Sequence, residues 1–325
     1  MILYFVTGRE AHTIENYLRE RGSAWRDRII PVPYENIPRM RSLPIATYIF
    51  SDLDRLTKAQ RHLAQHLYEA LSKSRLDLRI LNEPAGYVGR YDLLKSLHDA
   101  GINQFRAYRP YELDDDVRYP VFLRLERDHL GPRSALIHTR DELDQAITEA
   151  LMAGVWPNNL LIVEFCDVSD GNGVYRKYSV FRFGNHYMAR HVILGNEWFQ
   201  KAPKLKSGTN WPPEWLKEEK HFLEANPHLS QVRRAFELAK IDYGRIDYGI
   251  LKGKIQVWEI NSNPTCMTPI RDQIPHRVAF DELIARRFDE AWTMIDCTLH
   301  QAAPINICVS HTLLSATTAE NWSIG

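Results

Sequence analysis

Residues 244–264 read Gly-Arg-Ile-Asp-Tyr-Gly-Ile-Leu-Lys-Gly-Lys-Ile-Gln-Val-Trp-Glu-Ile-Asn-Ser-Asn-Pro, and this stretch decides the fold. Polar and apolar residues alternate over two short segments joined by a turn that contains Gly253. This pattern is typical of a β-hairpin. The two predicted strands carry four polar side chains that suit a metal and phosphate site: Arg245, Asp247, Glu259 and Asn261.

The pairing register decides whether these four side chains share a face, because a one-residue slip moves every side chain to the opposite face. If Tyr248 pairs with Val257, both faces mix apolar and charged groups. If Asp247 pairs with Glu259, one face carries Arg245, Asp247, Gly249, Val257, Glu259 and Asn261. The opposite face then carries Ile246, Tyr248, Ile250, Gln256, Trp258 and Ile260. Hydrophobic burial favours the second register, since it offers the core a nearly apolar face.

The second register places the carboxylates of Asp247 and Glu259 side by side. Two adjacent carboxylates repel each other unless a cation or a shared proton relieves them. Mg²⁺ suits this position, because it takes a few protein oxygens and completes its shell with water and substrate phosphate. The alternative is a surface hairpin whose charged face meets water.

The run Arg245-Ile246-Asp247, followed by a hairpin and by Glu259-Ile260-Asn261-Ser262-Asn263-Pro264, resembles the C-terminal signature of the ATP-grasp superfamily, which includes D-alanine–D-alanine ligase. The resemblance implies that Asp247, Glu259 and Asn261 bind Mg²⁺, or Mn²⁺ in its place. It also implies that Arg245 is catalytic, in contact with the transferred phosphate or the tetrahedral intermediate.

The expected fold is α/β (α+β), with a small N-terminal parallel domain and two ATP-grasp subdomains that clasp the nucleotide. Strands predicted at 2–6, 46–50 and 78–81 alternate with helices, which is typical of a parallel sheet. The predicted units are an N-terminal domain (1–108), a small lid subdomain (109–166), a C-terminal subdomain with the metal site (167–302) and a tail (303–325).

Residues 119–138 read as a strand, a polar loop and a second strand, and Thr139 with Glu142 predicts a capped helix start. In the superfamily this unit closes over the triphosphate. The usual strand lysine is replaced here by Arg124 or Arg127. Arginine still binds phosphate, and can do so with two hydrogen bonds.

The buried strand at 159–167 ends in acidic residues. By the same resemblance, Glu164 and the backbone of Phe165 and Cys166 face adenine, and Asp167 or Asp170 meets the ribose. A plain strand end followed by a turn accounts for the same residues. Residues 196–206 resemble the loop that brings a lysine over the nucleotide. The candidate lysines are Lys201 and Lys204.

The composition is that of a globular protein, with 44% hydrophobic and 25% charged residues among 325. Lys plus Arg and Asp plus Glu each number 41, so no charge excess indicates a nucleic-acid or membrane partner. The four cysteines form no CxxC pair, and reduced thiols in a cytoplasmic protein are expected. Oligomeric state is left open, a homodimer included.

The expected activity is that of an ATP- and Mg²⁺-dependent ligase that joins a carboxylate to an amine through an acylphosphate. The substrates would be small molecules. Two alternatives share the same metal site: an ATP-grasp kinase that phosphorylates a hydroxyl, and a degenerate protein that binds a nucleotide without turnover.

Overall fold

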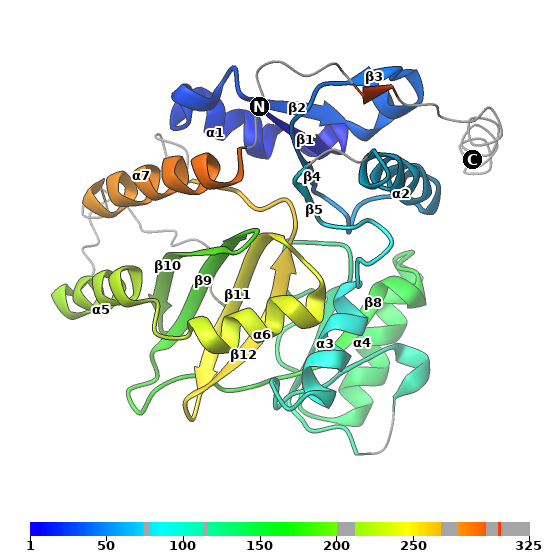
Figure 1. Ribbon diagram of the computed structural model, residues 1–325. Coiled ribbons are helices and arrows are strands. Elements are labelled where there is room, and N and C mark those ends of the chain that lie inside the picture. Colours follow the sequence, from blue (N-terminus) through cyan, green and yellow to red (C-terminus); the bar gives the residue numbers. More distant parts are fainter. Residues whose placement is uncertain (75–77, 114–115, 200–211, 268–277, 297–304, 307–325) are drawn as a thin grey trace.

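The computed structural model describes residues 1–74, 78–113, 116–199, 212–267, 278–296 and 305–306 (Figure 1). Its strands are β1 (Ile2–Val6), β2 (Ile29–Pro33), β3 (Ser42–Leu43), β4 (Thr47–Phe50), β5 (Ile80–Leu81), β6 (Ala107–Tyr108), β7 (Val121–Leu125), β8 (Leu160–Glu164), β9 (Tyr175–Phe183), β10 (His186–Gly195), β11 (Tyr243–Leu251), β12 (Lys254–Asn261) and β13 (Ile305–Asn306). Its α-helices are α1 (His12–Glu20), α2 (Lys58–Ser72), α3 (Arg90–Asp99), α4 (Arg140–Met152), α5 (Pro213–Ala225), α6 (Leu229–Ala239) and α7 (Val278–Ile295). The expected mixed α/β fold is confirmed.

The N-terminal sheet has the order β2-β1-β4-β5, and all its pairs are parallel. Strands β1 and β4 are buried along their whole length, as their continuous apolar runs predict. Helix α2 begins at a capping box, in which the Thr57 side chain accepts from the backbone of Gln60 and the Gln60 side chain bonds back. The small parallel domain expected at the N-terminus is therefore present.

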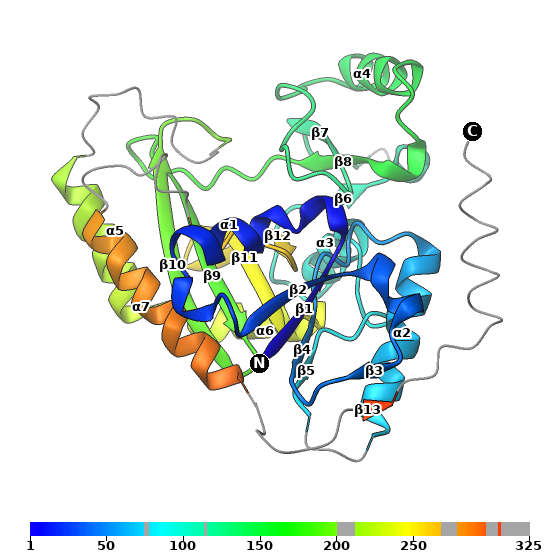
Figure 2. The same cartoon turned by 90° about the horizontal axis from the view of Figure 1, so that it is seen from above.

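A central antiparallel sheet follows, with the order β10-β9-β11-β12. Helices α5 and α6 pack on one side of it, while α7 lies between the sheet and α1 (Figures 1 and 2). Phe288 of α7 joins these layers, because its ring is 5.2 Å from that of Phe181 on β9 and 5.4 Å from that of Tyr17 on α1. Both faces of the sheet are thus covered over part of their length.

A smaller sheet, β6-β8-β7, forms the third unit together with α4 (Figure 2). Helix α4 starts at the predicted capping box of Thr139 and Glu142. The second strand expected at 135–138 is reduced to an isolated bridge between Val121 and Ile137. Helix α3 packs on β12 and α6, and β6 pairs with β8, so the first sheet ends well before the boundary drawn at residue 108.

Two buried asparagines join these units through hydrogen bonds from their side chains to backbone groups. Asn82, in the left-handed conformation at φ 66°, donates to the carbonyls of Phe50 and Tyr243 and accepts from the amides of Asp242 and Tyr243. The Asn103 side chain donates to the carbonyl of Val257 at 2.9 Å and accepts from the amide of Val257 at 2.7 Å. Its amide therefore satisfies the edge of β12, which a neighbouring strand would otherwise pair.

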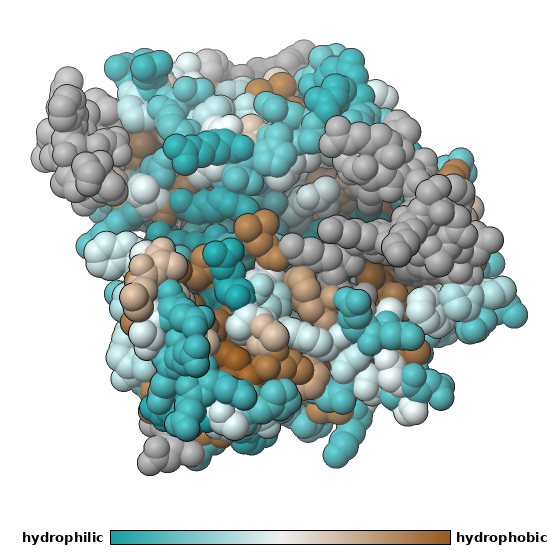
Figure 3. All heavy atoms as spheres, turned by 180° about the vertical axis from the view of Figure 1, so that it is seen from behind, coloured by the Kyte–Doolittle hydropathy of each residue, from teal (hydrophilic) through white to brown (hydrophobic). Residues whose placement is uncertain are grey.

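Viewed from behind, the surface is largely hydrophilic, and apolar side chains gather in the lower half of that face (Figure 3). None of the helices in the described part of the chain combines the length and apolarity needed to cross a membrane.

Candidate active site

The β11–β12 hairpin contains both registers considered for it, joined by a β-bulge. Asp247 pairs with Glu259 and Arg245 with Asn261, whereas Tyr248 pairs with Val257. Trp258 is the extra residue between the two registers. The predicted pairing of Asp247 with Glu259 and of Arg245 with Asn261 is therefore correct. On the other side of Trp258 the pairing is shifted by one residue.

The bulge corrects the faces predicted for three residues of β12. Val257 pairs with Tyr248 and is fully buried in the core, although it was expected on the polar face. Gln256 pairs with Gly249 and thus belongs to the polar face. Trp258 lines a cavity beside Glu259, because a bulge turns two successive side chains to nearly the same side. The Trp258 ring lies against Gly249, where a Cβ atom would be 2.8 Å from the indole.

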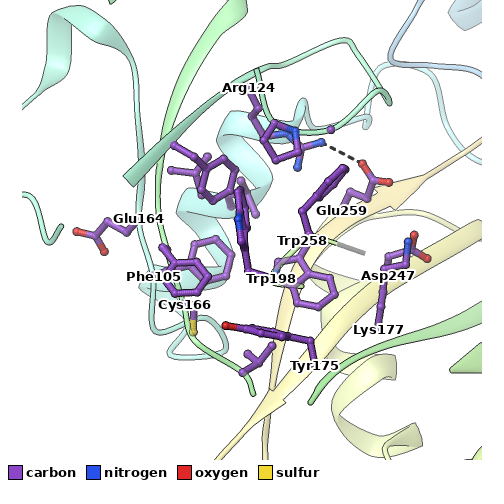
Figure 4. Close-up of a pocket in the computed structure, with 18 of the residues that line it drawn as sticks. Phe105, Arg124, Glu164, Cys166, Tyr175, Lys177, Trp198, Asp247, Trp258 and Glu259 are labelled. Atoms are coloured by element: carbon purple, nitrogen blue, oxygen red, sulfur yellow. Dashed lines mark hydrogen bonds and ion pairs between the residues drawn. The ribbon is translucent and has the colours of Figure 1, made fainter. Parts of the chain in front are cut away.

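This cavity encloses about 150 Å³ between the central sheet and the small sheet (Figure 4). One part of its wall is aromatic, formed by Phe105, Phe122, Phe165, Tyr175, Trp198, Phe199 and Trp258. The charged part of its wall is formed by Arg124, His129, Lys177, Asp247 and Glu259. The Trp198 ring is 5.2 Å from Phe122 and 5.8 Å from Phe165. The cavity thus combines a surface for a flat ring with a cluster of charges.

Glu259 is surrounded by three basic side chains from outside its own strand. Its Oε2 atom is 2.6 Å from Arg90, 3.3 Å from Arg124 and 3.7 Å from Nδ1 of His129. Burial opposes ionisation, but Arg90, His129 and Arg124 hold the pKa of Glu259 well below its usual range. Glu259 is therefore a carboxylate at neutral pH.

The basic side chains carry more charge than Glu259 neutralises. Burial, followed by the charge of Arg90, lowers the pKa of Arg124 to about 10. Burial alone would lower the pKa of His129, but the carboxylates of Asp54 and Glu259 raise it to about 9. Among the described residues, the buried Nε atoms of Arg90 and Arg124 have no hydrogen-bond partner. An unpartnered guanidinium N–H in a buried site favours an anionic ligand.

Arg90 also holds the backbone that follows β7. Its guanidinium donates to the carbonyl oxygens of Leu125, Glu126 and Asp128, as well as to Glu259. Arg90 was not singled out from the sequence, where it is one residue of an amphipathic helix. Only the packing of α3 against β12 gives it this place.

Asp247 is almost fully buried and is paired with the predicted catalytic Arg245. Arg245 Nε is 2.9 Å from Oδ1 of Asp247, and a terminal nitrogen is 3.2 Å from Oδ2. Asn261 lies opposite Arg245, and its Oδ1 accepts from the amide of Asn263 at 2.8 Å. The three predicted metal ligands therefore occupy paired positions on one face.

Their oxygen donors match the preference of Mg²⁺ in type. Both carboxylates are neutralised by guanidinium groups, however, and the described residues contain no group of three or more His, Cys, Asp or Glu that could hold a metal ion. A cation would have to share these carboxylates with Arg245 and Arg90.

The residues predicted to grip the nucleotide separate into two groups. Arg124, Phe165 and Cys166 line the cavity. Arg127 is exposed and is absent from the cavity wall as described, so the geometry favours Arg124 of the two. Lys201 and Lys204 lie outside the described residues.

Glu164 points its carboxylate away from the cavity (Figure 4). The side chain is 2% exposed and accepts hydrogen bonds from Arg106, Tyr108 and Arg118. Burial alone raises its pKa, but these bonds, those from Arg118 foremost, lower it to about 2. Its carboxylate therefore has a structural role here.

The two ribose candidates are on the loop after β8. Asp167 is exposed and accepts from the amide of Ser169 at 2.9 Å. Asp170 accepts from Asn172 and Val174 within its turn and pairs with Arg176 at 2.8 Å. Neither lines the cavity as described, so a role toward ribose stays a prediction.

Lys177 lines the cavity and was missed as a site residue. Strand alternation was the available signal, since Lys177 is two residues from Ser179, the cross-strand neighbour of Asp247.

A comparison with models of protein families finds no match, and a search of curated proteins finds none either. Among solved structures, the chain is similar to D-alanine–D-alanine ligase from Bacillus anthracis complexed with ATP, with 13% identity, a TM-score of 0.47 and coverage of 90% of this chain and 96% of that one. It is also similar to an ATP-grasp RimK domain protein from Sphaerobacter thermophilus, with 13% identity, a TM-score of 0.44 and coverage of 88% and 98%. A third is L-amino acid ligase from Bacillus licheniformis, with 12% identity, a TM-score of 0.39 and coverage of 80% and 66%. At TM-scores below 0.5 these likenesses assign no activity.

Proposed function

We propose that this chain is an ATP-dependent ligase of the ATP-grasp type, which joins a carboxylate to an amine through an acylphosphate. One observation carries the proposal: the cavity joins an aromatic wall to a charged end, where the buried Nε of Arg124 has no hydrogen-bond partner among the described residues. A nucleotide has the matching polarity, with a flat base at one end and phosphates at the other. The hairpin signature from Arg245 to Pro264 supports the same assignment.

The aromatic wall would hold the base. Stacking of a base on an aromatic side chain is worth about 1–3 kcal/mol. Trp198 is placed to supply such a surface, since its ring lies beside those of Phe122 and Phe165. Pockets for drug-sized ligands enclose about 300 Å³ or more, so we expect this cavity of about 150 Å³ to widen when a nucleotide enters.

The basic residues would bind the phosphates. Arg124 presents a buried guanidinium whose Nε is unpartnered among the described residues, and Lys177 reaches the same cavity. When bound, Mg²⁺ would neutralise phosphate charge at Asp247, Glu259 and Asn261. Arg245 would stabilise negative charge as the γ-phosphoryl group moves from ATP to the substrate carboxylate. The amine then attacks the acylphosphate carbon, and phosphate leaves.

Calorimetric titration with ATP and Mg²⁺, followed by product analysis over a panel of carboxylates and amines, tests the proposal. An amide formed together with ADP and free phosphate is the expected outcome. A phosphorylated hydroxyl with ADP would identify a kinase instead.

A non-catalytic nucleotide-binding protein is the second candidate. The pairing of Glu259 with Arg90 and of Asp247 with Arg245 favours it, because a guanidinium occupies each carboxylate that a metal needs. Nucleotide binding that is equally tight with and without Mg²⁺, and without ADP release over the panel, would decide for this candidate.

A further inference from the structure

A row of four polar side chains crosses the central sheet, one from each strand. The register pairs His191 of β10 with Ser179 of β9, Ser179 with Asp247 of β11, and Asp247 with Glu259 of β12. Ser179 is fully buried, in a strand whose neighbouring residues Val180 and Phe181 are also fully buried. A buried hydroxyl at such a position is costly unless it is hydrogen-bonded.

Both ends of the row depend on a β-bulge. On β12 the extra residue is Trp258, without which Glu259 would not oppose Asp247. On β10 the register shifts between Ala189 and His191, so that Arg190 is the extra residue. Since Ala189 opposes Val180, an unbroken ladder would place Arg190, and not His191, opposite Ser179. Bulges are over-represented next to active sites, where they redirect side chains.

The three residues on β9, β10 and β11 form a chain of hydrogen bonds. Ser179 Oγ lies 2.7 Å from Oδ1 of Asp247 and 2.8 Å from Nε2 of His191. A carboxylate can only accept, and a serine has a single hydroxyl proton, so Ser179 donates to Asp247. His191 Nε2 therefore carries a proton and donates to Ser179. This direction excludes Ser179 as a nucleophile activated by His191, because such a histidine would have to accept the serine proton.

The chain leaves the two oxygens of Asp247 in different environments. Oδ1 accepts from both Ser179 and Arg245, whereas Oδ2 accepts only from Arg245 among the described residues. The carboxylate is therefore held through Oδ1, and Oδ2 is the oxygen with capacity for a ligand.

We propose that Ser179 and His191 are positioning residues that orient the Asp247 carboxylate for a divalent cation. The inference rests on the proposed function, since it assumes that Asp247 is a ligand. Loss of a group that orients a ligating side chain typically costs 10–100-fold in metal affinity.

Titration of the full chain with Mn²⁺ alone, followed by the EPR signal of free Mn²⁺, tests the proposal. We expect Ser179→Ala to weaken Mn²⁺ binding about 10–100-fold. Ser51→Ala is the matched control, because Ser51 is also fully buried and donates to a carbonyl, that of Phe5, at 2.6 Å. It should lower the melting temperature without changing Mn²⁺ affinity.

His191 provides a second test in case Ser179→Ala does not fold, since its side chain is partly exposed. His191→Leu removes the donor and should weaken Mn²⁺ binding, while His191→Gln retains an N–H donor and should restore most of it. Equal affinities for the Leu and Gln variants and the wild type would overturn the positioning role.

Asp247→Asn distinguishes a failure of the proposed metal site from a failure of the positioning role. If this variant keeps wild-type Mn²⁺ affinity, Asp247 is not a ligand and the proposed metal site fails. If it loses affinity while the Ser179 and His191 variants keep theirs, the metal site stands and only the positioning role is overturned.

Discussion

The central sheet and the small β6-β8-β7 sheet both bring a buried carboxylate to the edge of one cavity, and they use it differently. In the central sheet, Asp247 faces its partner Glu259 on the cavity side. In the small sheet, Glu164 turns away from the cavity and is held by Arg106 and Arg118. A buried carboxylate thus faces the cavity or turns away from it according to which partners reach it. Strand position alone does not decide between these orientations.

The largest expected effect is on turnover when a central-sheet carboxylate loses its charge. We expect Asp247→Asn and Glu259→Gln each to lower ATP-dependent ADP release by about 100-fold or more, because the transferred phosphate loses charge stabilisation. The measurement is coupled ADP release with a substrate from the amide-forming panel. Asp144→Asn is the control, since its carboxylate pairs with Arg140 on α4 at 3.0 Å, outside the cavity as described. Unchanged turnover in both site variants would contradict the proposed role of Asp247 and Glu259 in catalysis.

Arg90 is expected to give the largest loss of stability. Arg90→Ala leaves Glu259 without its nearest cation and frees one backbone carbonyl at the end of β7 and two just after it. Breaking one side of a buried ion pair costs about 3–5 kcal/mol of unfolding free energy. Arg127, which is exposed on the segment after β7, is the matched control. We expect Arg127→Ala to change the free energy of unfolding by no more than about 0.5 kcal/mol. Urea unfolding of the two variants compares them directly; equal midpoints would show that Arg90 does not join the two sheets.

Glu164 is expected to make the free energy of unfolding depend on pH in the acid range. Its folded pKa, about 2, is below the ordinary value of 4.5, so its stabilising contribution is fully present above pH 4.5 and is lost as the pH falls toward 2. A shift of this size corresponds to about 3 kcal/mol. The difference in unfolding free energy between wild type and Glu164→Gln should therefore be large at pH 7 and small near pH 2. A difference that does not vary with pH would contradict the structural role.

The smallest expected effect concerns ATP affinity. If Arg124 binds phosphate, Arg124→Ala should raise the dissociation constant for ATP about tenfold, in line with the loss of one charge-assisted hydrogen bond. Arg127→Ala should leave it unchanged, because Arg127 is exposed and off the cavity wall as described. Calorimetry measures both. If the two variants respond equally, phosphate binding does not distinguish these arginines.

The hairpin could be predicted from the sequence because strand alternation is a local property. The pairing of Asp247 with Glu259 followed from which face is apolar. The bulge at Trp258 could not be predicted this way, because each register was considered for the whole hairpin. The pairing shifts by one residue at Trp258, where Val257 packs into the core.

The surroundings of the carboxylates were less accessible to sequence reasoning. Arg90 reaches Glu259 across 169 residues of chain, and Arg118 reaches Glu164 across 46. Such contacts depend on how helices and loops pack, which no local pattern records. The metal and nucleotide roles of these residues stay predictions until a ligand is bound.

The asparagine at position 82 has a mechanical consequence. Its four hydrogen bonds fasten β4 of the N-terminal sheet to the start of β11, so at this junction the two sheets are expected to shift together as one rigid body. Any widening of the cavity would then fall to the small sheet, whose β7 end is joined to Glu259 of the central sheet through the side chains of Arg90 and Arg124. A spin-label pair across β8 and β9 should therefore report a larger change of distance on adding nucleotide than a pair across β4 and β11.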